Sequence, residues 1–257
     1  MQRSTIAIAG CEIEMHEQGA GTPTLFLHAG NGFRPDDPYV EALTAGRRLI
    51  CPSHPGFGES ALPDWLDCID DIAHLYLELM DRLGLTKVDI IGCSIGGWIA
   101  ADMATKSPER FGKMVLVGPG GVKTGPADRL DIPDIFVLPA NEVTRLGFHD
   151  PVKWAFDPGK LSDAELVVAL RNRETLALLV WEPYMHNPKL LHRLQRVTSP
   201  TLFMRGASDG LISAAYLERY AALVKGASIV TIPEAGHMPH FEQPAAFAAA
   251  ALKFLDY

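Results

Sequence analysis

Residues 88–100, VDIIGCSIGGWIA, decide the fold. The first four form a short, mostly apolar run that predicts a buried strand, and a helical stretch follows to about Lys106. Between them lies a Gly-x-Ser-x-Gly pentapeptide, residues 92–96, centred on Ser94. A sharp strand-to-helix turn strains the serine backbone and exposes its hydroxyl, and it needs the glycines because side chains there would collide with neighbouring backbone. The pattern therefore predicts that Ser94 is a nucleophile.

Two other interpretations of this pentapeptide are open. Such a pentapeptide also occurs by chance, so residues 92–96 could be a Gly- and Ser-rich turn without chemistry. Cys93 offers a second nucleophile beside Ser94, but the glycine spacing centres on the serine. The position between a strand and a helix favours Ser94.

Further strands and helices alternate along the chain. Apolar runs bounded by turn residues predict strands, the first two as a hairpin around Gly10, at 5–9, 12–16, 24–27, 47–51, 113–117, 201–204 and 228–232. An apolar stripe with offsets of three and four predicts a helix over 69–83, and an Ala-rich helix is expected at about 244–255. This alternation indicates an α/β fold with a mostly parallel sheet covered on both faces.

Residues 122–196 interrupt the alternation. They contain no strand-like run, but Ser162 and Glu165 form a capping box before a helical pattern that continues to Trp181. We expect a helical insertion that lies over the edge where the strands end. Residues 1–121 and 197–257 then form the core, and residues 122–196 form a cap.

A serine hydroxyl needs a base, and the base needs a carboxylate that fixes its tautomer. His237 follows a strand and a glycine and would reach the carboxyl edge of the sheet, whereas His240 stands close to the final helix, where a structural role is more natural. Asp209 is the only acid directly after the strand 201–204, although an Asp beside Gly is also common in polar turns. The chain order Ser94, Asp209, His237 matches the order expected for this kind of turn.

Besides a nucleophile, a base and a carboxylate, a serine hydrolase site needs a pair of N–H donors that bind the oxyanion. One is expected from Ile95, directly after the nucleophile, and the other from the loop 27–33 after an early strand. Gly30 is the first choice for that second donor and Asn31 the second choice. The glycines of this loop would also suit a plain turn.

The composition of the chain excludes several classes of partner and site. The chain has 257 residues and a formal charge of −8 without a long basic run, so a nucleic-acid partner is not expected. No segment approaches the ~18 apolar residues of a membrane span, and no targeting segment is visible, so we expect a cytoplasmic location. The four cysteines contain no close pair, which predicts free thiols and no metal site or disulfide.

Five stretches together resemble the α/β-hydrolase family over nearly the whole chain: LFLHAGNG, RRLICPSHPGFGES, VDIIGCSIGGWIA, PTLFMRGASDG and EAGHMPHFEQP. The resemblance implies an eight-stranded, mostly parallel sheet with a cap inserted after the sixth strand. It also implies cofactor-free catalysis through Ser94, Asp209 and His237.

The chain departs from the family pattern in three places. His28 is followed by Ala29 where His-Gly is usual, and Ser53-His54 stands where an acid is common, so His54 is interpreted as a structural loop residue. Met238 follows His237, whereas relatives that hydrolyse carbon–carbon bonds of ring-cleavage products commonly have Trp there.

The expected function is hydrolysis of a small ester through an acyl-enzyme. Carbon–carbon, thioester or lactone hydrolysis, acyl transfer and non-catalytic ligand binding are the alternatives. Trp154 and Trp181 are predicted to line the substrate pocket, although aromatic residues of the cap could equally pack its own core. The cap arginines Arg145, Arg171 and Arg173 could bind a substrate carboxylate, but arginines of this kind are mostly solvated, so none of them is assigned that role. The oligomeric state is left open.

Overall fold

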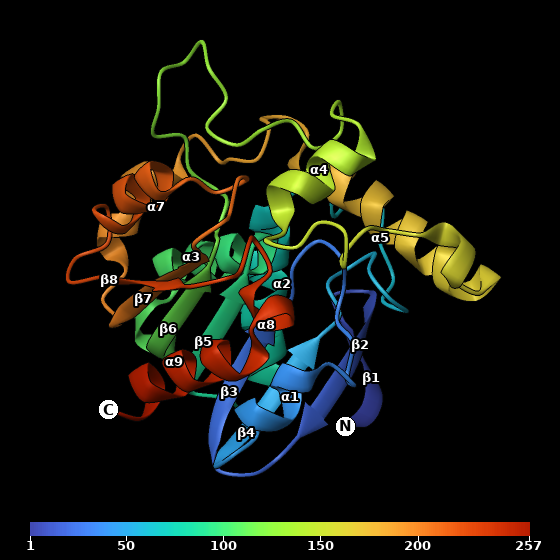
Figure 1. Cartoon of the computed structure of the whole chain (residues 1–257). Coiled ribbons are helices and arrows are strands. Elements are labelled where there is room, and N and C mark those ends of the chain that lie inside the picture. The colour runs from blue at the N-terminus through green and yellow to red at the C-terminus, as the bar shows by residue number, and fades with distance from the viewer.

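Eight strands form one sheet in the computed structural model, which describes residues 1–257 (Figure 1). The sheet order is β1-β2-β4-β3-β5-β6-β7-β8; β1 and β2 pair antiparallel, β2 and β4 pair antiparallel, and all later neighbours are parallel. The strands are β1 (Gln2–Ile8), β2 (Cys11–Gln18), β3 (Thr22–Leu27), β4 (Arg47–Pro52), β5 (Val88–Cys93), β6 (Phe111–Val117), β7 (Thr201–Gly206) and β8 (Ser228–Ile232). The predicted fold class is confirmed.

Helices cover both faces of this sheet. The face that α1 (Pro38–Leu43) and α9 (Pro244–Asp256) cover has one apolar cluster, and the opposite face has another beneath α2 (Ile69–Arg82), α3 (Ile95–Lys106) and α7 (Ala214–Ala221). Side chains of one strand alternate between these clusters, as expected for strands buried on both sides.

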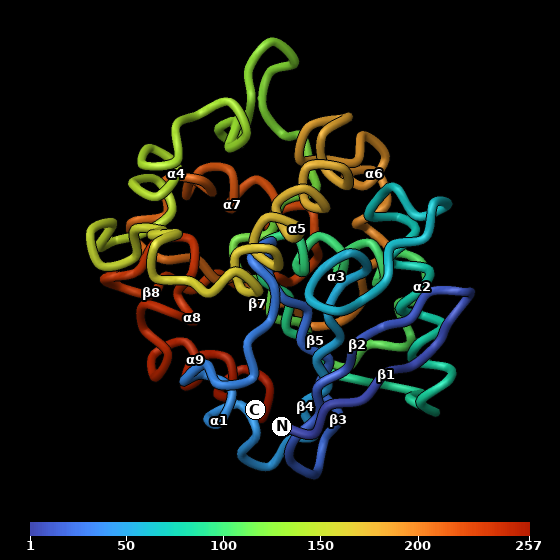
Figure 2. Tube along the Cα trace, turned by 90° about the vertical axis from the view of Figure 1, so that its right-hand side faces the viewer, coloured from blue at the N-terminus to red at the C-terminus, as the bar shows by residue number.

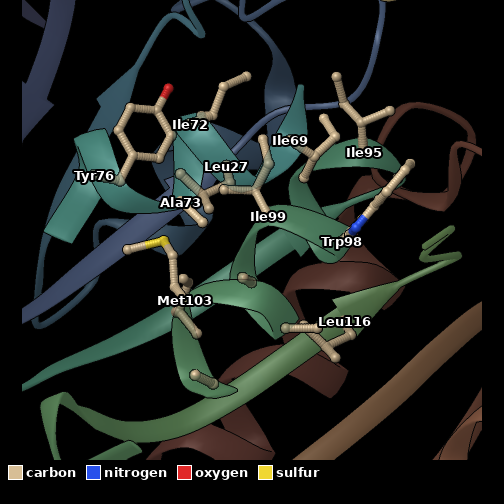
Figure 3. Close-up of a cluster of buried hydrophobic side chains, with 14 of the residues drawn as sticks. Leu27, Ile69, Ile72, Ala73, Tyr76, Ile95, Trp98, Ile99, Met103 and Leu116 are labelled. Carbon is tan, nitrogen blue, oxygen red and sulfur yellow. The ribbon is translucent and has the colours of Figure 1, made fainter. Parts of the chain in front are cut away.

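The contact between α2 and α3 shows how the predicted apolar stripe is used. Ile69, Ile72 and Tyr76 of α2 belong to the same buried apolar cluster as Trp98 and Ile99 of α3 (Figure 3). Each is at most 4 % exposed, so the stripe with offsets of three and four is a core face. This packing fixes the start of α3, which follows directly on Ser94.

Residues 122–196 contain helices and no strand: α4 (Ala140–Gly147), η2 (Pro158–Lys160), α5 (Asp163–Val180), α6 (Leu190–Arg193) and η3 (Leu194–Arg196). The predicted capping box forms, because Ser162 Oγ accepts from the Glu165 N–H while Glu165 Oε2 accepts from the Ser162 N–H. Figures 1 and 2 both show α4 and the long loop before it on the side of the molecule opposite the two termini. No helix of the protein combines the length and apolarity that crossing a bilayer requires.

Several short helices have no clear sequence signal. They are α1, α4, α6, α7 and α8 (Pro239–Glu242), none longer than eight residues. At this length the apolar period is sampled only about twice, so tertiary contacts decide the conformation.

Candidate active site

Ser94 occupies the turn between β5 and α3. Its φ of 53° and ψ of −113° are unusual for a residue with a side chain, which costs about 1–3 kcal/mol. A Cβ on Gly96 would collide with the backbone of Leu27 and His28, and one on Gly92 would collide with Gly96. The flanking glycines are therefore required by close backbone approach, for the reason that the sequence predicts.

The side chains of Ser94, His237 and Asp209 form one hydrogen-bonded chain. His237 Nε2 lies 3.0 Å from Ser94 Oγ, and His237 Nδ1 lies 3.0 Å from Asp209 Oδ2. The other carboxylate oxygen, Oδ1, accepts from the backbone N–H groups of Leu211 at 2.9 Å and Ile212 at 2.8 Å. Because an ionised carboxylate only accepts, Nδ1 holds the ring proton and Nε2 faces the serine hydroxyl as an acceptor.

Parallel strands bring these three residues to one edge of the sheet. Ser94 follows β5, Asp209 lies three residues after β7, and His237 lies five residues after β8. Asp209 and His237 are buried, whereas Ser94 is half-buried. Gly118, at the end of β6, leaves room for the imidazole, since a Cβ there would lie 3.0 Å from the His237 ring.

The three backbone N–H groups predicted as candidate oxyanion donors have no acceptor within the chain. Those of Gly30 and Asn31 donate no hydrogen bond, and Ile95 is the first residue of α3, whose N–H has no acceptor in the helix. The positive end of the helix dipole adds to the field at this point. These N–H groups are free to donate to a substrate oxygen, and their role as an oxyanion hole stays a prediction.

Two buried histidines fix the loop that carries Gly30. His28 Nε2 accepts from the His54 N–H at 2.9 Å, while His54 Nε2 donates to the carbonyl of His28 at 2.9 Å. The Tyr76 hydroxyl donates to His54 Nδ1 at 2.6 Å. Burial lowers the pKa of His28 to about 4 and holds the pKa of His54 well below its usual value, so both rings are neutral. Residue spacing does not indicate this network, because its members come from three separate segments.

Helix α5 lies against the same loop. The Leu176 side chain covers Gly30, where a Cβ would approach it to 2.7 Å. Asn172 Nδ2 donates to the carbonyl of Asn31 at 3.1 Å, and Thr175 Oγ1 donates to the carbonyl of Gly56 at 3.0 Å. Leu176 thus contacts the loop of the predicted oxyanion donors, and a search for aromatic residues misses it.

The two tryptophans predicted to line the pocket lie in separate aromatic clusters. Trp154 stacks on Phe148 with ring centroids 5.6 Å apart and on Phe241 with centroids 6.1 Å apart. Trp181 is 52 % exposed and packs against Phe136. The structure does not bring the two tryptophans together, and their substrate-binding role stays a prediction.

The three cap arginines already have partners. Arg145 pairs with Glu142 at 2.6 Å on the surface. Arg171 donates to the carbonyls of Gly58 and Ser60, and Arg173 donates to the carbonyl of Ile135. None of the three has a guanidinium free of intramolecular contacts.

The rival residues lie in other environments. The Cys93 thiol is buried on the α1 and α9 face, where desolvation raises its pKa far above the usual value. His240 is buried against Tyr39 and Phe247, its Nδ1 has no partner, and burial lowers its pKa to about 3.

A group of potential metal ligands, Asp67, Cys68 and Asp71, lies at the start of α2 and includes no member of the Ser94 chain. Cys68 donates to Asp71 at 3.2 Å, and burial raises the pKa of its thiol to about 11. The group is thus held together by its own hydrogen bond, with the thiol protonated near neutral pH.

The chain is similar to a known protein family and to individual hydrolases. Residues 24–250 match the family model described as alpha/beta hydrolase family. A 2-hydroxy-6-oxo-6-phenylhexa-2,4-dienoate hydrolase of Burkholderia cepacia is 26 % identical over 283 residues, covering 96 % of this chain and 92 % of the relative.

Two solved structures share the fold. A thermophilic esterase from Thermogutta terrifontis has a TM-score of 0.79 at 24 % identity, with 100 % of this chain and 98 % of that chain covered. A meta-cleavage product hydrolase from Pseudomonas fluorescens has a TM-score of 0.78 at 21 % identity, with 98 % and 97 % covered. These likenesses bear on the fold alone, whereas the family match spans most of the sequence. The chain belongs to the alpha/beta hydrolase family.

Proposed function

We propose that the protein is a serine hydrolase that cleaves a small, uncharged ester through an acyl-enzyme on Ser94. One observation carries the proposal: the unbroken hydrogen-bonded chain from Ser94 through His237 to Asp209, with the unpaired N–H of Ile95 directly after the nucleophile. A hydroxyl next to an imidazole nitrogen, with that imidazole held by a carboxylate, is the arrangement that makes a weak nucleophile reactive.

Each residue has a distinct task in this proposal. Ser94 Oγ attacks the acyl carbon while His237 Nε2 takes its proton, and the oxyanion is held by the N–H groups of Ile95 and Gly30. The imidazolium, stabilised by Asp209, then protonates the departing alcohol. Water attacks the acyl-enzyme with His237 again as base, which releases the carboxylic acid and restores Ser94.

Substrate choice is assigned to residues 122–196, which we propose act as a cap over the core formed by 1–121 and 197–257. Leu176 covers the loop of the oxyanion donors, and Trp154 and Trp181 are proposed as apolar walls further from Ser94. The partner is a small molecule, as it is for the hydrolase relatives.

Hydrolysis of a carbon–carbon bond is the second candidate. Several relatives are hydrolases of 2-hydroxy-6-oxo-6-phenylhexa-2,4-dienoate, 2-hydroxymuconate semialdehyde or 2-hydroxy-6-oxononadienedioate. A dienoate carries a carboxylate, and the three cap arginines are already engaged with other groups. Met238 also stands where carbon–carbon hydrolases of this kind commonly have Trp. Both points favour the uncharged ester.

Pre-steady-state kinetics tests the proposal. p-Nitrophenyl acetate and p-nitrophenyl butyrate should give a burst of p-nitrophenol close to the concentration of enzyme, followed by turnover. A kcat/KM for 2-hydroxy-6-oxo-6-phenylhexa-2,4-dienoate above that for every ester would favour the second candidate. Faster product release on addition of an alcohol would indicate acyl transfer, and no burst with any substrate would contradict catalysis by Ser94.

A further inference from the structure

A short cap segment, residues 146–150, is bonded to both loops that carry the Asp209–His237 pair. The Leu146 carbonyl accepts from the Gly210 N–H at 2.8 Å, next to Asp209. The Gly147 carbonyl accepts from the N–H of His237 itself at 2.7 Å. The cap therefore contacts the backbone of the two loops whose relative position sets the Asp209–His237 hydrogen bond.

Glu242, the last residue of α8, fixes the other end of this segment. Its Oε1 accepts from the N–H groups of His149 at 2.9 Å and Asp150 at 3.2 Å, and its Oε2 accepts from the N–H of Gly236 at 2.5 Å. One carboxylate thus ties residues 149–150 of the cap to the residue that precedes His237. Hydrogen bonds to a charged acceptor are the stronger kind.

The local sequence permits this close approach. A Cβ on Gly236 would collide with the carbonyl of Gly147 and the Cα of Phe148, and a Cβ on Gly210 would press on Leu146 at 3.0 Å. His149 Nδ1 also lies 2.8 Å from Ser208 Oγ, a further contact between the cap segment and the Asp209 loop.

We infer that Glu242 is a positioning residue for catalysis, which acts by clamping the cap segment 146–150 onto the Asp209 and His237 loops. The inference rests on the proposed function and deepens it: the cap helps to set the geometry of the catalytic pair in addition to selecting the substrate. Glu242 does not touch the reacting atoms. It acts through Gly236 and the cap segment on the position of His237.

The variant Glu242→Gln tests the clamp. Its amide keeps one acceptor oxygen, but its NH₂ group meets a backbone N–H, so at least one of the three contacts is lost. We expect kcat for p-nitrophenyl butyrate to fall roughly ten- to a hundredfold with KM almost unchanged, because a small misplacement of the base affects the transition state rather than binding. The rate of Ser94 phosphonylation should fall by a similar factor.

Glu234→Gln is the matched control, because the exposed Glu234 lies in the same loop and its carboxylate makes no hydrogen bond or ion pair. It should keep wild-type kcat. The downfield proton NMR signal of the His237 Nδ1–H should broaden in Glu242→Gln and persist in Glu234→Gln, a difference that a purely structural role would not produce. Glu242→Asp, which draws both oxygens back by one methylene, replaces the glutamine variant if that one does not fold.

The outcomes separate the two proposals. Suppose that the wild type hydrolyses esters and that folded Glu242→Gln keeps full kcat and an unchanged NMR signal. This result would overturn the proposed clamp, and the proposed serine hydrolase function would stand. Absence of ester turnover in the wild type would overturn the proposed function itself. A loss confined to KM would also contradict the clamp, since it would assign Glu242 to substrate binding.

Discussion

The two edges of the parallel sheet both gather charged side chains, but under opposite conditions. At the amino edge, the buried Arg47 donates to Asp89 at 2.8 Å, to Thr24 at 3.0 Å and to Asp256 at 2.5 Å. At the carboxyl edge, Ser94 is half-buried in a strained backbone conformation and shares His237 with Asp209. Parallel strands align both groups of residues equally well.

The difference between the edges separates two roles: the amino edge stabilises the fold, and the carboxyl edge carries reactive groups. The Arg47 group ties three strands to the C-terminal helix, and removing one partner would leave a buried charge uncompensated. The Ser94 group retains unpaired N–H donors and a strained nucleophile, which a stability-optimised edge would not contain. Substitutions at the two edges should therefore affect different measurements.

The largest effect is expected at the carboxyl edge. Asp209→Asn should lower kcat by about 10⁴-fold, because asparagine favours the wrong tautomer of His237 and cannot stabilise the imidazolium. The melting temperature should change little in comparison. Steady-state kinetics with p-nitrophenyl butyrate measures this, and nearly full activity would mean that another acid orients the base.

At the amino edge the order of effects should reverse. Arg47→Met should reduce the free energy of unfolding by about 3–5 kcal/mol, because Asp89 stays buried without its partner. Arg48→Met is the control, since the pair that Arg48 forms with Glu17 is more than one-third exposed and contributes at most about 1 kcal/mol. Urea unfolding measures both variants. Equal losses, or a fall in kcat of folded Arg47→Met, would contradict the division between the edges.

A third test concerns a buried histidine next to the site. Burial lowers the pKa of His240 to about 3, so between pH 6.5 and 3 the unfolded chain binds a proton that the native protein does not. The stability from the neutral ring is complete above pH 6.5 and is lost as the pH falls, at about 1.4 kcal/mol per unit.

Between pH 7 and pH 5 the free energy of unfolding should therefore fall by about 2 kcal/mol less in His240→Phe than in the wild type. Urea unfolding at each pH measures the difference. Its ester turnover at pH 8 should be retained. A stability difference that is the same at both pH values would contradict the argument, and loss of turnover would give His240 a role at the carboxyl edge.

The smallest effect is expected from the cap over the reactive edge. We expect the bulky aromatic residues of the cap to make the pocket compact, so the activity profile across p-nitrophenyl esters should peak at short acyl chains. Each methylene that fits contributes at most about 0.8 kcal/mol of binding, and the first that does not fit costs a comparable amount or more. Trp181→Ala should move this peak towards longer chains, whereas Trp65→Ala, at a tryptophan of similar exposure outside the cap, should not. An unmoved peak in Trp181→Ala would leave this tryptophan to its packing against Phe136.

Sequence patterns predict the two edges unequally well. The strands, α2, α3 and α5 carry either an apolar period or a capping box, and the turn around Ser94 carries its own glycine spacing. The convergence of Ser94, His237 and Asp209 follows from loops that leave one edge of a parallel sheet.

The remaining features have no local signature. The contacts of Leu146 and Gly147 use backbone carbonyls, which any residue has, and the pair His28 and His54 depends on a register between distant loops. The exposure of Trp181 likewise depends on how the cap packs, because an aromatic residue at a helix end suits a pocket wall or a surface equally.

Labelling with a fluorophosphonate, followed by mass spectrometry of the tryptic peptides, tests the central claim most directly. The account predicts one phosphonyl group per chain, located on Ser94, together with loss of ester hydrolysis at the rate of labelling. The folded variant Ser94→Ala should take up no label and hydrolyse no ester above background. Labelling of another residue, or hydrolysis that survives in Ser94→Ala, would contradict the assignment of the nucleophile.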